Sequence, residues 1–123
     1  MVTLLNEYYR IDRQVAENDG AFLFSITLLA EFHAYAGHFP DNPVAPGVCN
    51  IQLIKECAEQ LVGKRLFLAF IAKCRFSAVL IPKPSPHVQL RMRLMDGTRN
   101  VIATLFDDTT TYIEFKGEFT VIR

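Results

Sequence analysis

The chain has 123 residues, of which 50% are hydrophobic and 21% are charged, so it is long enough for one domain with a buried core and too apolar for a disordered protein. We expect a single domain over residues 1–123, and the balance of 13 Lys and Arg residues against 13 Asp and Glu residues gives no reason to expect nucleic acid or a membrane surface as a partner. No apolar run approaches the roughly 20 residues of a membrane helix, and the first residues lack the basic and apolar regions of a secretion signal, so we expect a cytoplasmic protein.

The first part of the chain has the pattern of two strands. Apolar residues alternate with more polar ones over residues 9–15 and again over residues 22–28, as in strands with one buried face. Between these runs, Asn18-Asp19-Gly20 is typical of a turn. We therefore predict two strands before the first proline cluster.

Residues 47–63 have the pattern of one long helix. Apolar residues recur there at helical spacing, and Gly63 is a typical helix stop. The polar residues of the segment fall on the opposite arc: Gln52, Lys55, Glu56, Glu59 and Gln60. Lys55 and Glu59 are one turn apart, so we expect an ion pair between them on a polar helix face.

Four further strands are predicted after the helix. Residues 66–76 are apolar and rich in β-formers, and alternation returns over residues 88–94, 101–106 and 113–121, with a turn at Asp96-Gly97. A single helix cannot cover both faces of a parallel sheet, so we predict an α+β domain with a mostly antiparallel sheet wrapped around the helix. The other face or the open edge needs cover, which a homo-oligomer would supply.

The three cysteines and three histidines form no pattern of a disulfide framework or a zinc site. These residues are Cys49, Cys57, Cys74, His33, His38 and His87. We expect buried or half-buried thiols in a reducing compartment and no metal. His33 is expected to be structural, because its spacing from His38 does not present both side chains on one face of a helix.

The basic residues are unevenly distributed although the net charge is zero. The segment from Gln60 to Met95 contains no Asp or Glu but has seven cations: Lys64, Arg65, Lys73, Arg75, Lys83, Arg91 and Arg93. A local basic surface would suit an acidic protein or a phosphate. Arg91 and Arg93 share one strand face, which is either solvated or part of such a docking surface.

The segment Ala36–Val48, with Gly-His-Phe-Pro followed by Pro-Gly-Val at the start of the helix, resembles the signature of the hot-dog fold 3-hydroxyacyl-(acyl carrier protein) dehydratases. Similarity extends to Tyr9–Arg13, which looks like the first strand of that family, and to Cys74–Phe76 followed by Ile81-Pro82. The Gly-Asp that follows this proline in the family is replaced by Lys83-Pro84.

The resemblance implies a hot-dog fold, in which an antiparallel sheet wraps around one long central helix. It further implies dimerisation through the sheets and a tunnel at the dimer interface that admits an acyl chain carried on phosphopantetheine, with acyl carrier protein as partner and no other cofactor. In this family the motif histidine, here His38, is the general base. A carboxylate fourteen positions later, from the other subunit, assists departure of the 3-hydroxyl. That position holds Gln52.

The start of the helix offers a second element of the expected chemistry. Unpaired backbone N–H groups near Gly47 and Val48 can polarise a thioester carbonyl, and a glycine permits its close approach. Phe39 and Phe76 are expected to contact the substrate. The expected carrier-binding cations are Lys73, Arg75 and Lys83.

The missing carboxylate leaves several functions open. The Gln52 amide can hydrogen-bond a hydroxyl or a water but cannot give up a proton. Glu56, one turn later, is either a displaced acid or part of the polar helix face, and the family commonly has Glu then Gln at this pair of positions. The leading hypothesis is a dehydratase. The alternatives are a non-catalytic or half-site subunit of a heterodimer with a carboxylate-bearing hot-dog paralogue, an acyl thioesterase in which Gln52 orients water, and an acyl-binding module.

Overall fold

The computed structural model describes residues 3–17, 19–29, 47–78, 80–81, 86–95 and 100–122. Its elements are β1 (Tyr9–Ala16), β2 (Phe22–Leu28), α1 (Gly47–Val62), β3 (Leu66–Phe76), β4 (His87–Met95), β5 (Asn100–Phe106) and β6 (Thr111–Val121). Each strand and the helix predicted from the sequence is present. No helix among these residues has the length and apolar character needed to cross a membrane.

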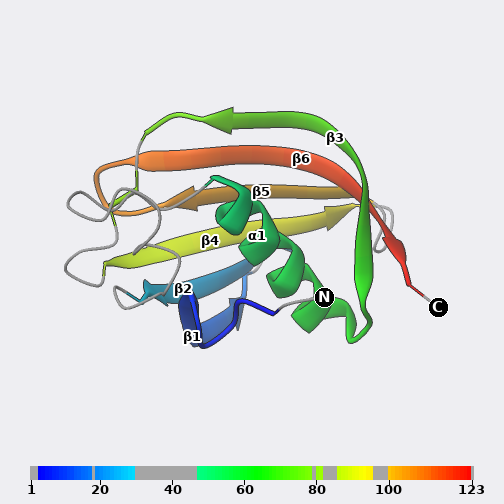
Figure 1. Cartoon of the computed structure of the whole chain (residues 1–123), viewed down its shortest axis with the longest axis horizontal. Helices are drawn as coiled ribbons and strands as arrows, with labels where there is room; N and C mark the ends of the chain where they lie inside the picture. The colour runs from blue at the N-terminus through cyan, green and yellow to red at the C-terminus, as the bar shows by residue number, and fades with distance from the viewer. Residues whose placement is uncertain are drawn as a thin grey trace.

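The six described strands form one sheet in the order β1-β2-β4-β5-β6-β3, and all neighbouring strands are antiparallel. Figure 1 shows the sheet curving around α1, with β3 bending over the helix at one end and β1 and β2 at the other. This is the hot-dog arrangement, so the predicted fold is confirmed.

Alternation along the strands explains which face of the sheet contacts the helix. In β4, the side chains of Val88, Leu90 and Met92 are buried, while Arg91 and Arg93 lie on the other face and make ion pairs there. The helix contributes fully buried apolar residues, namely Leu53, Ile54, Cys57 and Ala58. Burying a Leu or Ile side chain stabilises a fold by about 1.5–3 kcal/mol, so the packing of α1 against the sheet stabilises the domain.

Gly63 ends α1 as the sequence predicts. Its φ is +69°, a left-handed conformation that glycine adopts without strain, and its N–H donates to the Glu59 carbonyl at 2.8 Å. The Glu59 carboxylate also accepts from the N–H of Leu66 at 2.7 Å. The helix end is thereby fixed to the start of β3.

Strand β3 lies at one end of the described sheet and exposes a row of large apolar side chains. Phe67, Phe70, Ile71 and Phe76 are 41% to 60% exposed. The register between β3 and β6 shifts twice, so the strand is irregular as well as apolar. An exposed apolar strand at a sheet edge tends to pair with another chain. Such pairing would agree with the oligomer expected from the sequence, which stays a prediction.

Candidate active site

The structure describes some of the predicted site residues and not others. His38, Phe39 and Lys83 lie outside the described residues, as does His33. Among the described residues, Gly47, Val48, Gln52 and Glu56 lie on α1, and Lys73, Arg75 and Phe76 lie on β3. The described part of the site is therefore the helix and the strand that follows it.

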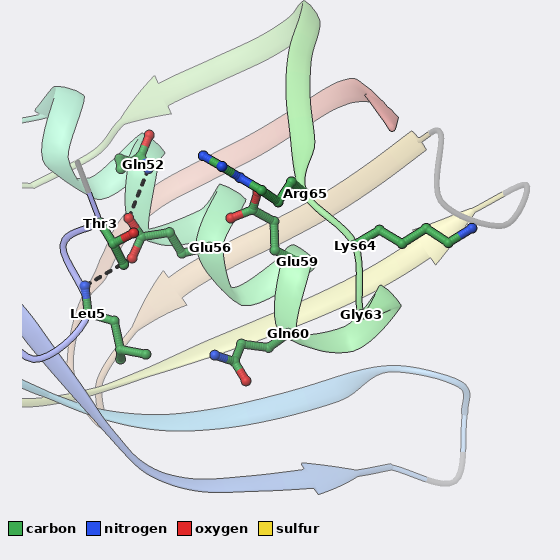
Figure 2. Close-up of a pocket in the computed structure, with 9 residues that line it drawn as sticks. All are labelled: Thr3, Leu5, Gln52, Glu56, Glu59, Gln60, Gly63, Lys64 and Arg65. Atoms are coloured by element: carbon green, nitrogen blue, oxygen red, sulfur yellow. Dashed lines mark hydrogen bonds between the residues drawn. The ribbon is translucent and has the colours of Figure 1, made fainter. Parts of the chain in front are cut away.

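Gln52 lines a groove of about 560 Å³ along the polar side of α1. Residues 3–8, which precede β1, are called the N-terminal segment. Figure 2 shows the lining of the groove, with Thr3 and Leu5 of this segment on one side and Glu59 and Arg65 further along. The groove combines amide, carboxylate and guanidinium groups. Its lining thus offers both hydrogen-bond donors and hydrogen-bond acceptors.

The floor of this groove is the buried carboxylate of Glu56, which is 6% exposed. Its Oε2 accepts from the Leu4 N–H at 2.8 Å and from Gln52 Nε2 at 2.8 Å. Its Oε1 accepts from the Leu5 N–H at 3.0 Å and from the Tyr9 hydroxyl at 2.8 Å. Four donors thus occupy both oxygens, which satisfies a buried charge that would otherwise be costly.

The predicted polar helix face is buried more deeply than the sequence suggested. Lys55 and Glu56 are only 5% and 6% exposed, and the Glu56 carboxylate accepts from the N–H groups of Leu4 and Leu5, which lie before β1. The predicted ion pair is confirmed, with Lys55 Nζ 3.8 Å from Glu59 Oε2. The middle of this arc is therefore buried, whereas Gln60 at its end is exposed.

Two tyrosines that the sequence analysis missed donate hydrogen bonds to polar residues of α1. Tyr8 and Tyr9 are fully buried, and the Tyr8 hydroxyl donates to Asn50 Oδ1 at 2.5 Å. Burial, assisted by Cys57 and the Glu56 carboxylate, raises the pKa of Tyr9, which stays a protonated donor. The sequence did contain a signal for these residues. Two adjacent tyrosines stand at the start of the first predicted strand, and the predicted helix has polar residues that could bind their hydroxyl groups.

The cysteines lie where the sequence placed them, with Cys57 buried and Cys49 and Cys74 half-buried. Burial, with a further contribution from Glu56, raises the pKa of Cys57, so this thiol is protonated and a poor nucleophile. No three His, Cys, Asp or Glu side chains of the described segments are grouped so that they could hold a metal ion.

The first residue of α1 is packed against the last residue of β3. A Cβ at Gly47 would lie 2.9 Å from the Cζ of Phe76, so a larger residue would displace the ring. Val48, the next residue, is 74% exposed. Two reasons therefore favour glycine at position 47: the predicted close approach of a thioester and the contact with the Phe76 ring.

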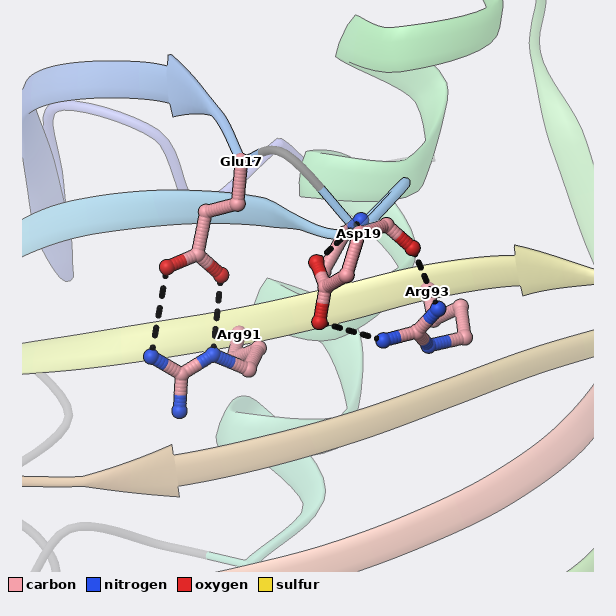
Figure 3. Close-up of polar contacts among 5 residues, drawn as sticks. Glu17, Asp19, Arg91 and Arg93 are labelled. Carbon is pink, nitrogen blue, oxygen red and sulfur yellow. Dashed lines mark hydrogen bonds and ion pairs between the residues drawn. The ribbon is translucent and has the colours of Figure 1, made fainter.

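The described basic residues lie on separate parts of the sheet. Arg91 pairs with Glu17 at 2.9 Å and Arg93 with Asp19 at 2.8 Å, which joins β4 to the turn between β1 and β2 (Figure 3). Strands β5 and β6 separate these arginines from β3, where Lys73 lies 3.9 Å from Glu114. Arg91, Arg93 and Lys73 are therefore each ion-paired, and the docking surface expected from the sequence stays a prediction.

Solved structures with the same fold include a chain of the dehydratase heterocomplex ApeI:P from Xenorhabdus doucetiae, with a TM-score of 0.75 at 18% identity over 89% of this chain and 96% of that chain. An uncharacterized protein from Erwinia carotovora subsp. atroseptica matches with a TM-score of 0.66 at 18% identity over 89% of this chain and 92% of that chain. These two likenesses show the fold alone.

Curated relatives are 3-hydroxyacyl-(acyl-carrier-protein) dehydratases FabZ. The protein from Caldanaerobacter subterraneus subsp. tengcongensis is 40% identical over 55 residues, which is 39% of each chain. The protein from Halalkalibacterium halodurans is 33% identical over 95 residues, which is 69% of this chain and 65% of the relative. The matched parts are thus less than two thirds of each of these relatives. A family model described as ApeI-like, ApeI dehydratase, matches residues 13–114. The chain therefore belongs to the ApeI-like dehydratase family.

Proposed function

We propose that the protein dehydrates 3-hydroxyacyl thioesters carried on acyl carrier protein, in biosynthesis of the fatty-acid type. The observation that carries this proposal is the family match over residues 13–114, since it spans both the His38 motif and the helix that bears Gln52. The curated relatives are named for the same reaction.

The proposed reaction is a β-elimination in which His38 takes a proton from C2 of the acyl chain. The electron pair of that C–H bond becomes the second bond between C2 and C3, and the C3–O bond breaks. His38, now protonated, returns one proton to the departing oxygen, which leaves as water, because the Gln52 amide cannot donate one. N–H groups at the start of α1, near Gly47, stabilise the negative charge that develops on the thioester oxygen.

The direct test is turnover of a 3-hydroxyacyl carrier protein by the purified chain, followed by mass spectrometry. We expect the acyl group to lose one water, and His38→Ala to abolish the loss because an imidazole ordinarily titrates near neutral pH and suits a general base. Full dehydration by His38→Ala would contradict the proposal. Release of a free thiol in place of dehydration would indicate a thioesterase.

A second candidate is a half-site subunit of a heterodimeric dehydratase. It is favoured by the position of Gln52, which has an amide where the reaction needs a proton donor, beside a Glu56 carboxylate whose oxygens already accept four hydrogen bonds. The structural neighbour from Xenorhabdus doucetiae is itself part of a dehydratase heterocomplex. A partner hot-dog subunit with a carboxylate would complete one site with His38.

These two candidates differ in what the isolated chain does. A homodimeric dehydratase turns over substrate alone, whereas a half-site subunit gains activity only when a carboxylate-bearing hot-dog protein is added. Co-purification followed by mass measurement of the native complex identifies which assembly forms. Turnover by the isolated chain at a rate unchanged by the second protein would exclude the half-site candidate.

A further inference from the structure

We propose that Glu56 is a positioning residue, which together with the N-terminal segment holds the Gln52 amide in one orientation, with its nitrogen inward and its carbonyl oxygen toward the ligand. The catalytic consequence rests on the proposed dehydratase function. The orientation itself does not, and it can be measured without turnover.

The first step of the argument is the contact between the two side chains. Gln52 Nε2 lies 2.8 Å from Glu56 Oε2, and a carboxylate can only accept hydrogen bonds. Rotating the amide by half a turn would place two acceptors against each other. Figure 2 shows the result, with the nitrogen of Gln52 directed at Glu56 and its oxygen directed away.

The second step is that Glu56 cannot turn to follow a flipped amide. Its other three donors are the N–H groups of Leu4 and Leu5 and the hydroxyl of Tyr9. The two backbone donors belong to a tight turn, in which the Tyr8 N–H donates to the Leu4 carbonyl at 2.8 Å. Rotation of the carboxylate would leave buried donors unsatisfied, which is unfavourable.

The third step is what this orientation offers to a ligand. An outward carbonyl oxygen accepts a hydrogen bond from a hydroxyl or a water. In the proposed site Gln52 would accept from the 3-hydroxyl of the substrate and hold it, and the proton for the departing oxygen would come from another group. A site built to accept from a hydroxyl discriminates against acyl groups that lack one.

The orientation is tested by solvent exchange of the glutamine side-chain amide protons, measured by NMR on the intact protein. We expect a Gln52 amide proton to exchange at least about tenfold more slowly than those of Gln60, an exposed glutamine of the same helix. Tyr9→Phe, which removes a donor from the other oxygen of Glu56, should keep this difference. Equal exchange at Gln52 and Gln60 would overturn the proposal, whether or not the protein is a dehydratase.

The positioning role is tested by a double-mutant cycle on turnover, with any partner subunit present. Glu56→Gln should lower kcat by about tenfold with a smaller effect on KM, and it should have no further effect in a Gln52→Leu background, because Glu56 acts through Gln52. Equal losses in both backgrounds would overturn the role. If Glu56→Gln does not fold, the exchange measurement on the unaltered protein still decides the orientation. If no acyl substrate is dehydrated, the proposed function fails while the orientation is judged by exchange alone.

Discussion

Gln52 is almost isosteric with a glutamate, and this makes the lost proton donor straightforward to restore. Gln52→Glu would place a second carboxyl group beside Glu56 Oε2, where the amide nitrogen now lies 2.8 Å away. Two carboxylates at such a distance cannot both ionise readily, so the pair would retain a proton and its pKa would rise. If the isolated chain lacks only a general acid, we expect its dehydration rate to rise by ~10²-fold or more.

The measurement is the pH dependence of kcat for Gln52→Glu and for Gln52→Met, which has a similar size but no acid. Only the glutamate variant should gain activity, and its rate should fall as pH rises through the elevated pKa, since the carboxyl acts in its protonated form. If Gln52→Glu stays inactive with its fold and oligomeric state intact, the homodimeric dehydratase is excluded.

The site residues were predictable from sequence only where a motif or a spacing marked them. The interval from His38 identified Gln52, and the one-turn spacing identified the pair of Lys55 and Glu59, which the structure confirms at 3.8 Å. The partners of Glu56 were not predictable. Two of them are backbone N–H groups 51 and 52 residues away, and a backbone donor is the same in every residue except proline.

At the scale of elements, the Tyr9 hydroxyl is one of the donors that join the start of the chain to Glu56 on α1. Tyr9→Phe removes a hydrogen bond to a buried carboxylate and leaves the ring in place, so we expect the free energy of unfolding to fall by about 1.5–3 kcal/mol. Urea denaturation monitored by circular dichroism measures the change. An unchanged denaturation midpoint would show that water replaces the hydroxyl and that the attachment does not depend on this contact.

The cations of β3 lead to a prediction about the carrier. Lys73→Glu or Arg75→Glu should weaken the use of carrier-bound substrates far more than that of short pantetheine thioesters, because an acidic carrier is attracted to the strand and a small analogue is not. Arg91→Glu is the matched control, since it makes the same kind of charge reversal on β4, which β5 and β6 separate from β3. Equal losses on both substrate types would indicate misfolding or no docking role.

The hydrophobic periodicity of the sequence was sufficient to locate the strands and the helix. It was not sufficient to predict which segments pack against them. Alternation in period two located the strands, and helical spacing located α1, because burial of one face imposes these patterns. The pattern separates the polar arc of the helix from the apolar one, but it does not say what lies over the polar arc. Glu56 is buried there and bound by the N–H groups of Leu4 and Leu5, which belong to a turn before β1.

For the whole molecule, the exposed phenylalanines of β3 predict association through this edge. Phe70 is 60% exposed on the strand that ends the described sheet. Phe70→Glu should shift the protein toward monomer, because it places a charge in an apolar contact. Analytical ultracentrifugation measures the shift, and the same substitution at Ile102, which is 37% exposed on β5, is the control.

An oligomeric state unaffected by Phe70→Glu would place the interface elsewhere on the molecule. Which copy or paralogue covers the edge was beyond sequence reasoning. Zero net charge and an apolar strand are compatible with either partner.

The strand order also has a consequence for synthesis on the ribosome. Strand β3 is made before β4 and β5, yet its neighbour in the described sheet is β6, the last of the described strands to emerge. Until β6 has emerged, β3 lacks its neighbour in the described sheet, and its phenylalanines are open to other chains. A stalled or truncated product without β6 would expose β3 and β5 together. Such fragments should be the species most prone to aggregate.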